Sequence, residues 1–70
     1  MKTIDTRGLS CPEPVLRTRA ALVALDPGET LEVLADTVTA RDNITRSAQS
    51  EGCTVESEAA GNDFKLTIKK

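Results

Sequence analysis

The chain has 70 residues, a net charge of −2, no histidine and a single aromatic side chain, Phe64. A chain of this length buries only about 60% of the surface that it exposes when unfolded, which leaves room for one small domain over residues 1–70. The lack of a basic excess and of further aromatic residues disfavours direct binding to nucleic acid. Without histidine, neither a Ser-His nor a Cys-His pair can form within the chain.

The two cysteines, Cys11 and Cys53, are too few to ligate zinc or an iron–sulfur cluster within one chain. We therefore expect no metal and no other cofactor. The longest apolar run, residues 20–25, is far shorter than a membrane span, and Asp5 and Arg7 interrupt the apolar stretch that a signal peptide would need. These patterns predict a cytoplasmic protein without a membrane segment, whose cysteines are thiols in a reducing compartment.

The first half of the chain predicts a strand, a helix and a second strand. Residues 2–6 have a short β-leaning pattern that ends at Gly8, a breaker. From Pro12 the apolar positions follow helical spacing as far as the stop signals at residues 26–28. Residues 30–36 have the pattern of a central strand, and this order implies a right-handed parallel crossover. The apolar residues on one face of this strand are Leu31, Val33 and Ala35.

A second helix is predicted to begin at Thr39, a candidate N-cap, and to stop at Gly52. Asp42 would stand at the third helical position, as in a capping box. The apolar stripe of this helix is narrow, so only one edge of the helix should pack against the rest of the fold, while most of its surface stays exposed to solvent. The residues of the stripe are Ala40, Ile44 and Ala48.

The last third of the chain predicts a hairpin. Residues 53–59 and 64–68 alternate between apolar and polar on either side of Gly61-Asn62, a two-residue turn signal. The resulting order β-α-β-α-β-β predicts an α+β fold. We expect a two-layer α/β sandwich in which both helices cover one face of a four-stranded mixed sheet.

Secondary structure alone does not explain the residues around Cys11. Proline suits the first helical position, so Pro12 predicts that Cys11 is the N-cap of the first helix. Because Pro14 also lacks an N–H, the free donors of the first turn would be those of Glu13 and Val15. These donors and the partial positive charge of the helix start would lower the pKa of the thiol and favour the nucleophilic thiolate.

Other residues near the thiol are candidates for supporting roles. The carboxylate of Glu13 would raise the pKa of the thiol unless Arg17, at i+4, or Arg7 neutralises it. Gly8 would let the loop turn tightly. Asp5 could hold backbone N–H groups at the end of the first strand, and Arg7 could lower the pKa of the thiol.

The cysteines and the helix arginines also have interpretations that involve no chemical function. Cys11 could be an unreactive residue before a proline-started helix, and Cys53 is expected to be a buried structural thiol. Four arginines on the two helices could contact an acidic partner, although such charges are usually solvated. They are Arg17, Arg19, Arg41 and Arg46.

Residues 7–15, Arg-Gly-Leu-Ser-Cys-Pro-Glu-Pro-Val, resemble the signature of the TusA/SirA-like sulfur-carrier family. The resemblance extends along nearly the whole chain, through residues 26–29 and Asp36. It implies that Cys11 carries sulfur as a persulfide, received from a cysteine desulfurase or rhodanese and passed to an acceptor protein. The pathways served by such carriers are tRNA thiolation, cofactor biosynthesis and sulfur oxidation. With Cys11 as the catalytic residue, the supporting residues are Pro12, Glu13, Pro14, Gly8, Arg7 and Asp5.

Two alternatives accompany this resemblance. Residues 43–46, Asn-Ile-Thr-Arg, together with Gly52 look like the amino-terminal domain of YedF-type proteins, which are linked to selenium metabolism. Carriers that feed tRNA thiolation commonly have Asp-Ile-Pro in this helix instead. A regulatory or interaction module would use the same exposed helix start to bind a partner without covalent chemistry. As a carrier, the protein would be a monomer that meets its donor and acceptor transiently and depends on these partner enzymes for turnover.

Overall fold

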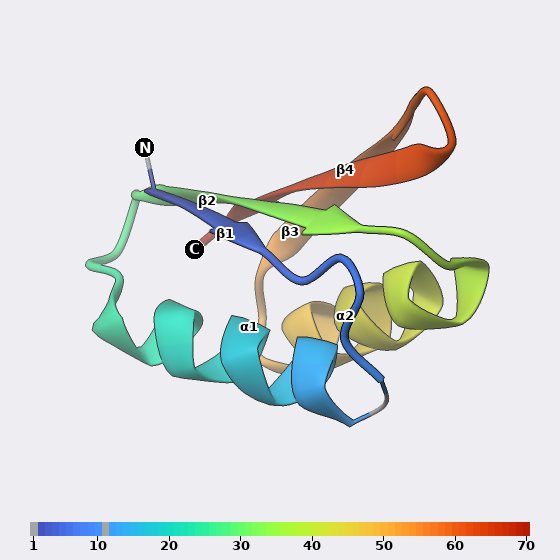
Figure 1. The fold of residues 1–70 in the computed structure, drawn as a ribbon. Helices are drawn as coiled ribbons and strands as arrows, with labels where there is room; N and C mark the ends of the chain where they lie inside the picture. Colours follow the sequence, from blue (N-terminus) through green and yellow to red (C-terminus); the bar gives the residue numbers. More distant parts are fainter. Residues whose placement is uncertain (1, 11) are drawn as a thin grey trace.

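A computed structural model describes residues 2–10 and 12–70. The elements follow the order β-α-β-α-β-β, and the predicted α+β fold is confirmed (Figure 1). Their bounds are β1 (Lys2–Asp5), α1 (Glu13–Ala24), β2 (Thr30–Ala35), α2 (Val38–Ser50), β3 (Thr54–Ala60) and β4 (Asp63–Lys69).

The four strands form one mixed sheet in the order β1-β2-β4-β3. β1 and β2 are parallel, whereas β4 runs antiparallel to both of its neighbours. Both helices lie on the same face of the sheet and begin at the same end of the molecule, where β1 and β2 finish (Figure 1). The loop between β1 and α1 therefore lies near the connection between β2 and α2.

The core lies between the helices and the covered face of the sheet. The face of β2 predicted to be apolar is fully buried, and Ile44 and Ala48 of the predicted α2 stripe are also fully buried, with Ala40 half-buried beside them. Lys70 fastens the end of α1 to the last strand, because its Nζ donates to the carbonyl oxygens of Leu22 and Leu25 at 2.9 and 2.7 Å. The buried apolar residues are Leu22, Leu25, Leu31, Val33, Ala35, Ile44, Ala48, Cys53, Leu66 and Ile68.

The start of α2 differs from the prediction by two residues. Thr37, and not Thr39, is the N-cap, and its Oγ1 accepts the N–H of Ala40 at 3.0 Å. Thr37 has extended backbone angles directly after β2, so the helix can begin at Val38. The third helical position is therefore Ala40, and the predicted capping box with Asp42 was wrong.

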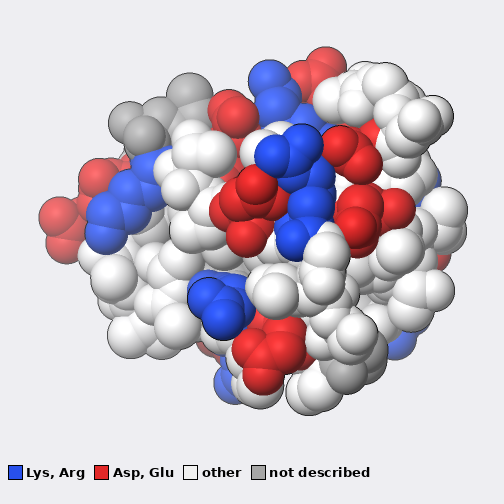
Figure 2. Space-filling model, in the orientation of Figure 1, with Lys and Arg blue, Asp and Glu red and all other residues white. Residues whose placement is uncertain are grey.

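The hairpin is confirmed, with Ala60 paired to Asp63 across the Gly61-Asn62 turn. Gly61 has a φ of +66°, a left-handed conformation that glycine adopts without strain. Figure 2 shows basic and acidic side chains interspersed on one face of the molecule. Neither described helix has the length and apolar run needed to cross a membrane.

Candidate functional site at the start of α1

The loop from β1 to α1 is held by successive backbone hydrogen bonds. Thr6 is fully buried, and both its N–H and its hydroxyl donate to the carbonyl oxygen of Leu34 in β2, the N–H at 2.9 Å. The N–H of Leu9 turns back to the carbonyl oxygen of Thr6 at 3.3 Å. Gly8 stands between them with a φ of +79°, so an alanine here would be strained although nothing occupies the space of its Cβ.

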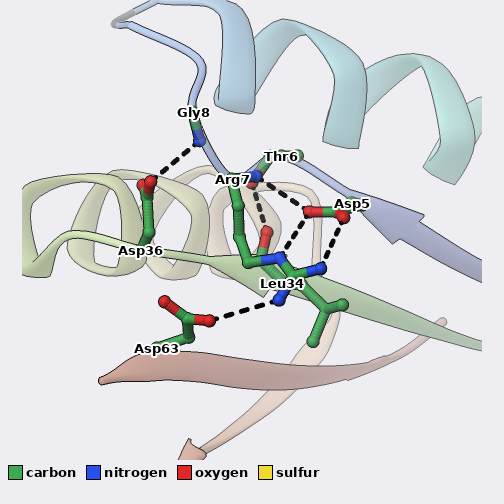
Figure 3. Close-up of polar contacts among 7 residues, drawn as sticks. All are labelled: Asp5, Thr6, Arg7, Gly8, Leu34, Asp36 and Asp63. Carbon is green, nitrogen blue, oxygen red and sulfur yellow. Dashed lines mark hydrogen bonds and ion pairs between the residues drawn. The ribbon is translucent and has the colours of Figure 1, made fainter. Parts of the chain in front are cut away.

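Two aspartates hold the guanidinium of Arg7 (Figure 3). Asp5 accepts from Nε at 2.9 Å and from Nη2 at 2.8 Å, and it also accepts the backbone N–H of Arg7 at 3.0 Å. Asp63, at the start of β4, accepts from Nη1 at 3.2 Å. Asp5 thus holds one backbone N–H, that of Arg7, and its predicted supporting role for the thiol stays a prediction. Arg7 joins the end of β1 to β4.

These contacts shift the pKa values of both Asp5 and Arg7. The hydrogen bond from the Arg7 side chain, followed by that from its backbone N–H, lowers the pKa of Asp5 to about 2. The same partner raises the pKa of Arg7 further above its ordinary range, with Asp63 contributing after Asp5. The charge of Arg7 is therefore balanced by two carboxylates.

A third aspartate reaches the loop from the end of β2. The carboxylate of Asp36 accepts the N–H of Gly8 at 2.8 Å (Figure 3). Asp36 is half-buried, and the next residue, Thr37, caps α2. One side chain thus connects the loop to the start of the second helix.

The first turn of α1 also differs in detail from the prediction. Pro12 is the N-cap, with a φ of −97° and a ψ of 13°, and the helix begins at Glu13. The prediction that Cys11 is the N-cap and Pro12 the first helical residue was therefore wrong by one position, while Cys11 itself lies outside the described residues. The N–H of Glu13 donates to the carbonyl oxygen of Ser10 at 2.8 Å, so it is not the free donor that was predicted. Arg17 pairs with the Glu13 carboxylate at 3.6 Å, as expected for i and i+4, and both side chains are exposed.

An open hollow of about 280 Å³ lies between this loop and the start of α2. None of the eight described residues that line it is charged. Leu16 of α1 and Val38 of α2 are also apolar and are half exposed, at 51% and 52%. The wall of this hollow is therefore neutral, whereas the charged side chains of Glu13 and Arg17 lie outside its lining. The lining residues are Leu9, Ser10, Pro14, Val15, Thr37, Thr39, Ala40 and Asn43.

The remaining predicted residues are not among those that line the hollow. Cys53 is 9% exposed and packs in the core, as predicted. The guanidinium of Arg41 lies 4.8 Å from the centre of the Phe64 ring and pairs with Asp42, while Arg19 pairs with Glu51 at 3.8 Å. The suggestion that these arginines contact a partner stays a prediction.

Sequence patterns assigned a site role to Asp5 but not to Asp36 or Asp63. For Asp36 a signal was present, because it follows a predicted central strand parallel to the first, and the carboxyl ends of parallel strands meet at one edge. Asp63 gave no such signal, since its contact with Arg7 depends on where the hairpin joins the sheet.

We expect the Asp5–Arg7 pair to persist well into the acid range. The pKa of Asp5 in the folded chain is about 2, below its ordinary value of 3.8, so the pair stabilises the loop above pH 3.8 and this contribution is lost as the pH falls through 2. NMR titration of the Asp5 side-chain carboxyl carbon measures this pKa. Arg7→Met should return it towards 3.8. An Asp5 pKa near 3.8 in the wild-type protein would show that the pair does not form in solution.

A small α+β fold with two helices on one face of a mixed sheet also describes a SirA-like protein from Desulfitobacterium hafniense. Its crystal structure superimposes with a TM-score of 0.88 at 36% identity, covering 97% of this chain and 95% of that chain. The family described as sulfurtransferase TusA matches residues 2–70. The chain therefore belongs to the TusA family.

Two relatives are each named a "putative sulfur carrier protein". One, from Methanocaldococcus jannaschii, is 45% identical over 71 residues, which cover 100% of this chain and 95% of the relative. The other, from Bacillus subtilis, is 36% identical over 70 residues, which cover 99% of this chain and 93% of the relative. The similarity thus spans both the motif and the rest of the fold.

Proposed function

We propose that this protein is a sulfur carrier that holds sulfur as a persulfide on Cys11. The observation that carries the proposal is the TusA family match over residues 2–70, which includes the Cys-Pro-Glu-Pro motif at residues 11–14. The exposure of Ser10 and Pro12, on either side of Cys11 in the sequence, supports access by a partner enzyme. The neutral hollow beside them supports docking of a partner enzyme through contacts that do not depend on the partner's charge.

The proposed transfer needs no oxidant or reductant. The thiolate of Cys11 attacks the terminal sulfur of a persulfide on a desulfurase or rhodanese. A new S–S bond forms on Cys11 while the donor's S–S bond breaks, and the donor cysteine leaves as a thiolate. A nucleophile on the acceptor protein then takes the terminal sulfur in the same way and returns Cys11 to its thiolate form.

Mass spectrometry of the intact protein tests this proposal. After incubation with a cysteine desulfurase and cysteine, we expect a gain of one sulfur atom, about 32 Da, that dithiothreitol removes. A rhodanese with thiosulfate provides a second donor. An unchanged mass with both donors would contradict the carrier function and favour an interaction module that binds without covalent chemistry.

A selenium carrier is the second candidate. Residues 43–46 resemble those of YedF-type proteins, and Asn43 lines the hollow beside the motif. A desulfurase given selenocysteine in place of cysteine would then load one selenium atom on Cys11. Loading in competition, with equal amounts of the two amino acids, distinguishes the two carriers by which adduct forms first.

The working form that we propose is a monomer in which residues 1–70 make one domain. It would act in the cytoplasm, where thiols stay reduced, and would meet its donor and acceptor transiently. Its pathway would be tRNA thiolation, cofactor biosynthesis or another branch of sulfur metabolism.

A further inference from the structure

We propose that Asp36 is a positioning residue for sulfur transfer, because its carboxylate fixes the backbone that leads to Cys11. This inference rests on the carrier function proposed above. Asp36 does not need to touch the sulfur. It acts through the hydrogen bond from the N–H of Gly8, three residues before Cys11, at 2.8 Å (Figure 3).

The hydrogen bonds of the loop show why this contact matters. Thr6 is tied to β2 through Leu34. Beyond Gly8, the backbone hydrogen bonds within the described part of the loop are local, from Leu9 to Thr6 and from Glu13 to Ser10. Among the described residues, the Gly8–Asp36 hydrogen bond is thus the last one before residue 11 that connects the loop to the end of a strand.

The position of Asp36 lets one side chain hold two segments in place. Asp36 directly follows β2, which is paired on both sides, with β1 and with β4. The next residue, Thr37, caps α2 through its bond with Ala40. The carboxylate therefore links the loop to the start of α2. These two segments supply Leu9 and Ser10 on one side of the hollow, and Thr37, Thr39 and Ala40 on the other.

The bond with Asp36 differs from the ion pairs of Arg7. The side chains of Arg7 and Asp5 are about half exposed, at 46% and 51%, and exposed ion pairs contribute little. Asp36 accepts the main-chain N–H of Gly8, 28 residues away in the sequence, so this bond holds the main chain of the loop at the end of β2. Arg7 reaches Asp63 only through its side chain, and the main-chain N–H that Asp5 accepts is two residues away. The φ of +79° at Gly8 sets the direction of the loop at this point. We infer that Asp36 contributes more than Arg7 to the placement of the following residues.

Kinetics of sulfur loading test the inference. Asp36→Ala removes the acceptor, whereas Asp36→Asn keeps an oxygen that can accept the Gly8 N–H. A displacement of about 1 Å at a reacting group can slow a reaction on the order of 100-fold, so we expect kcat for loading by a cysteine desulfurase to fall about tenfold in Asp36→Ala. Asp36→Asn should stay within about twofold of the wild type. Asp26→Ala, with the same change of charge in the turn after α1, should load at the wild-type rate.

Amide hydrogen exchange gives a second readout that does not depend on a partner. The Gly8 amide should exchange about tenfold faster in Asp36→Ala than in Asp36→Asn, while amides of β2 stay protected. If Asp36→Ala is partly unfolded, Asp36→Glu replaces it, because the longer side chain keeps the charge and displaces the acceptor. The same loss of kcat and of Gly8 protection is expected.

The outcomes separate this inference from the carrier function. Wild-type protein that gains no sulfur from any donor contradicts the carrier function, while Gly8 exchange still reports on the bond. Wild-type kcat in Asp36→Ala overturns the positioning role even if loading occurs. Equal losses of kcat in Asp36→Ala and Asp36→Asn also overturn it, because the charge of Asp36 rather than the bond to Gly8 would then be responsible.

Discussion

Cys11→Ser is expected to abolish sulfur loading completely, whereas Cys53→Ser should still gain one sulfur atom. A serine hydroxyl cannot form a persulfide, and it is not ionised at neutral pH. Residue 11 precedes Pro12, the N-cap of α1, and serine has the shape of cysteine with oxygen in place of sulfur, so the fold should survive the change. Cys53 is 9% exposed and packs in the core, so little of this residue is accessible to a partner enzyme.

Intact mass after incubation with desulfurase and cysteine measures both variants. Far-UV circular dichroism and a urea transition provide the control for folding. Because a hydroxyl in the core can cost about 1–3 kcal/mol, Cys53→Ala is the matched variant if Cys53→Ser is destabilised. Loading of Cys11→Ser together with failure of the Cys53 variants would reverse our assignment of the reactive thiol.

Ile44→Ala should cause a large loss of stability. Ile44 is fully buried and holds α2 against the sheet. Truncating a buried isoleucine to alanine costs about 2–5 kcal/mol, because apolar contacts are lost and a cavity remains. A domain of this size has a free energy of unfolding of about 4–10 kcal/mol. The change therefore removes a large part of the total stability.

Urea denaturation followed by circular dichroism measures this loss, with Val38→Ala as the control on the same helix. Val38 is 52% exposed, so its truncation should shift the free energy of unfolding by less than about 1 kcal/mol. The expected result is a lower urea midpoint for Ile44→Ala with an unchanged slope. A shift as small as that of the control would mean that α2 is not held by its apolar stripe.

Local sequence patterns were sufficient for most of the fold. Alternation predicted the buried face of β2, the turn residues Gly61-Asn62 predicted the hairpin, and helical spacing predicted both helices. These signals act over a few residues and do not depend on how the elements pack. The motif around Cys11 likewise indicated the family from the residues alone, and the match over residues 2–70 confirmed it.

The start of α2 shows where local patterns stop being sufficient. Thr37 and Thr39 are both good N-cap residues, and the narrow apolar stripe is compatible with either. The choice depends on β2, which ends at Ala35 and leaves Thr37 extended, with its side chain free to accept from Ala40. Because the end of a strand is set by its pairing with β1 and β4, no window of sequence around Thr37 contains this information.

The contacts of the candidate site depend still more on tertiary structure. Arg7 meets Asp63, which is 56 residues away, and Gly8 meets Asp36, which is 28 residues away. The sequence contains several acidic residues with which Arg7 could pair, and by charge alone Glu13 was as reasonable a partner as Asp63. The pairing followed from the strand order β1-β2-β4-β3, which brings the ends of β1 and β2 and the start of β4 to one edge of the sheet. Strand order is a property of the packed chain, because it requires distant segments to share one hydrophobic core. The side chains that support the loop therefore reach their positions only when that core has formed.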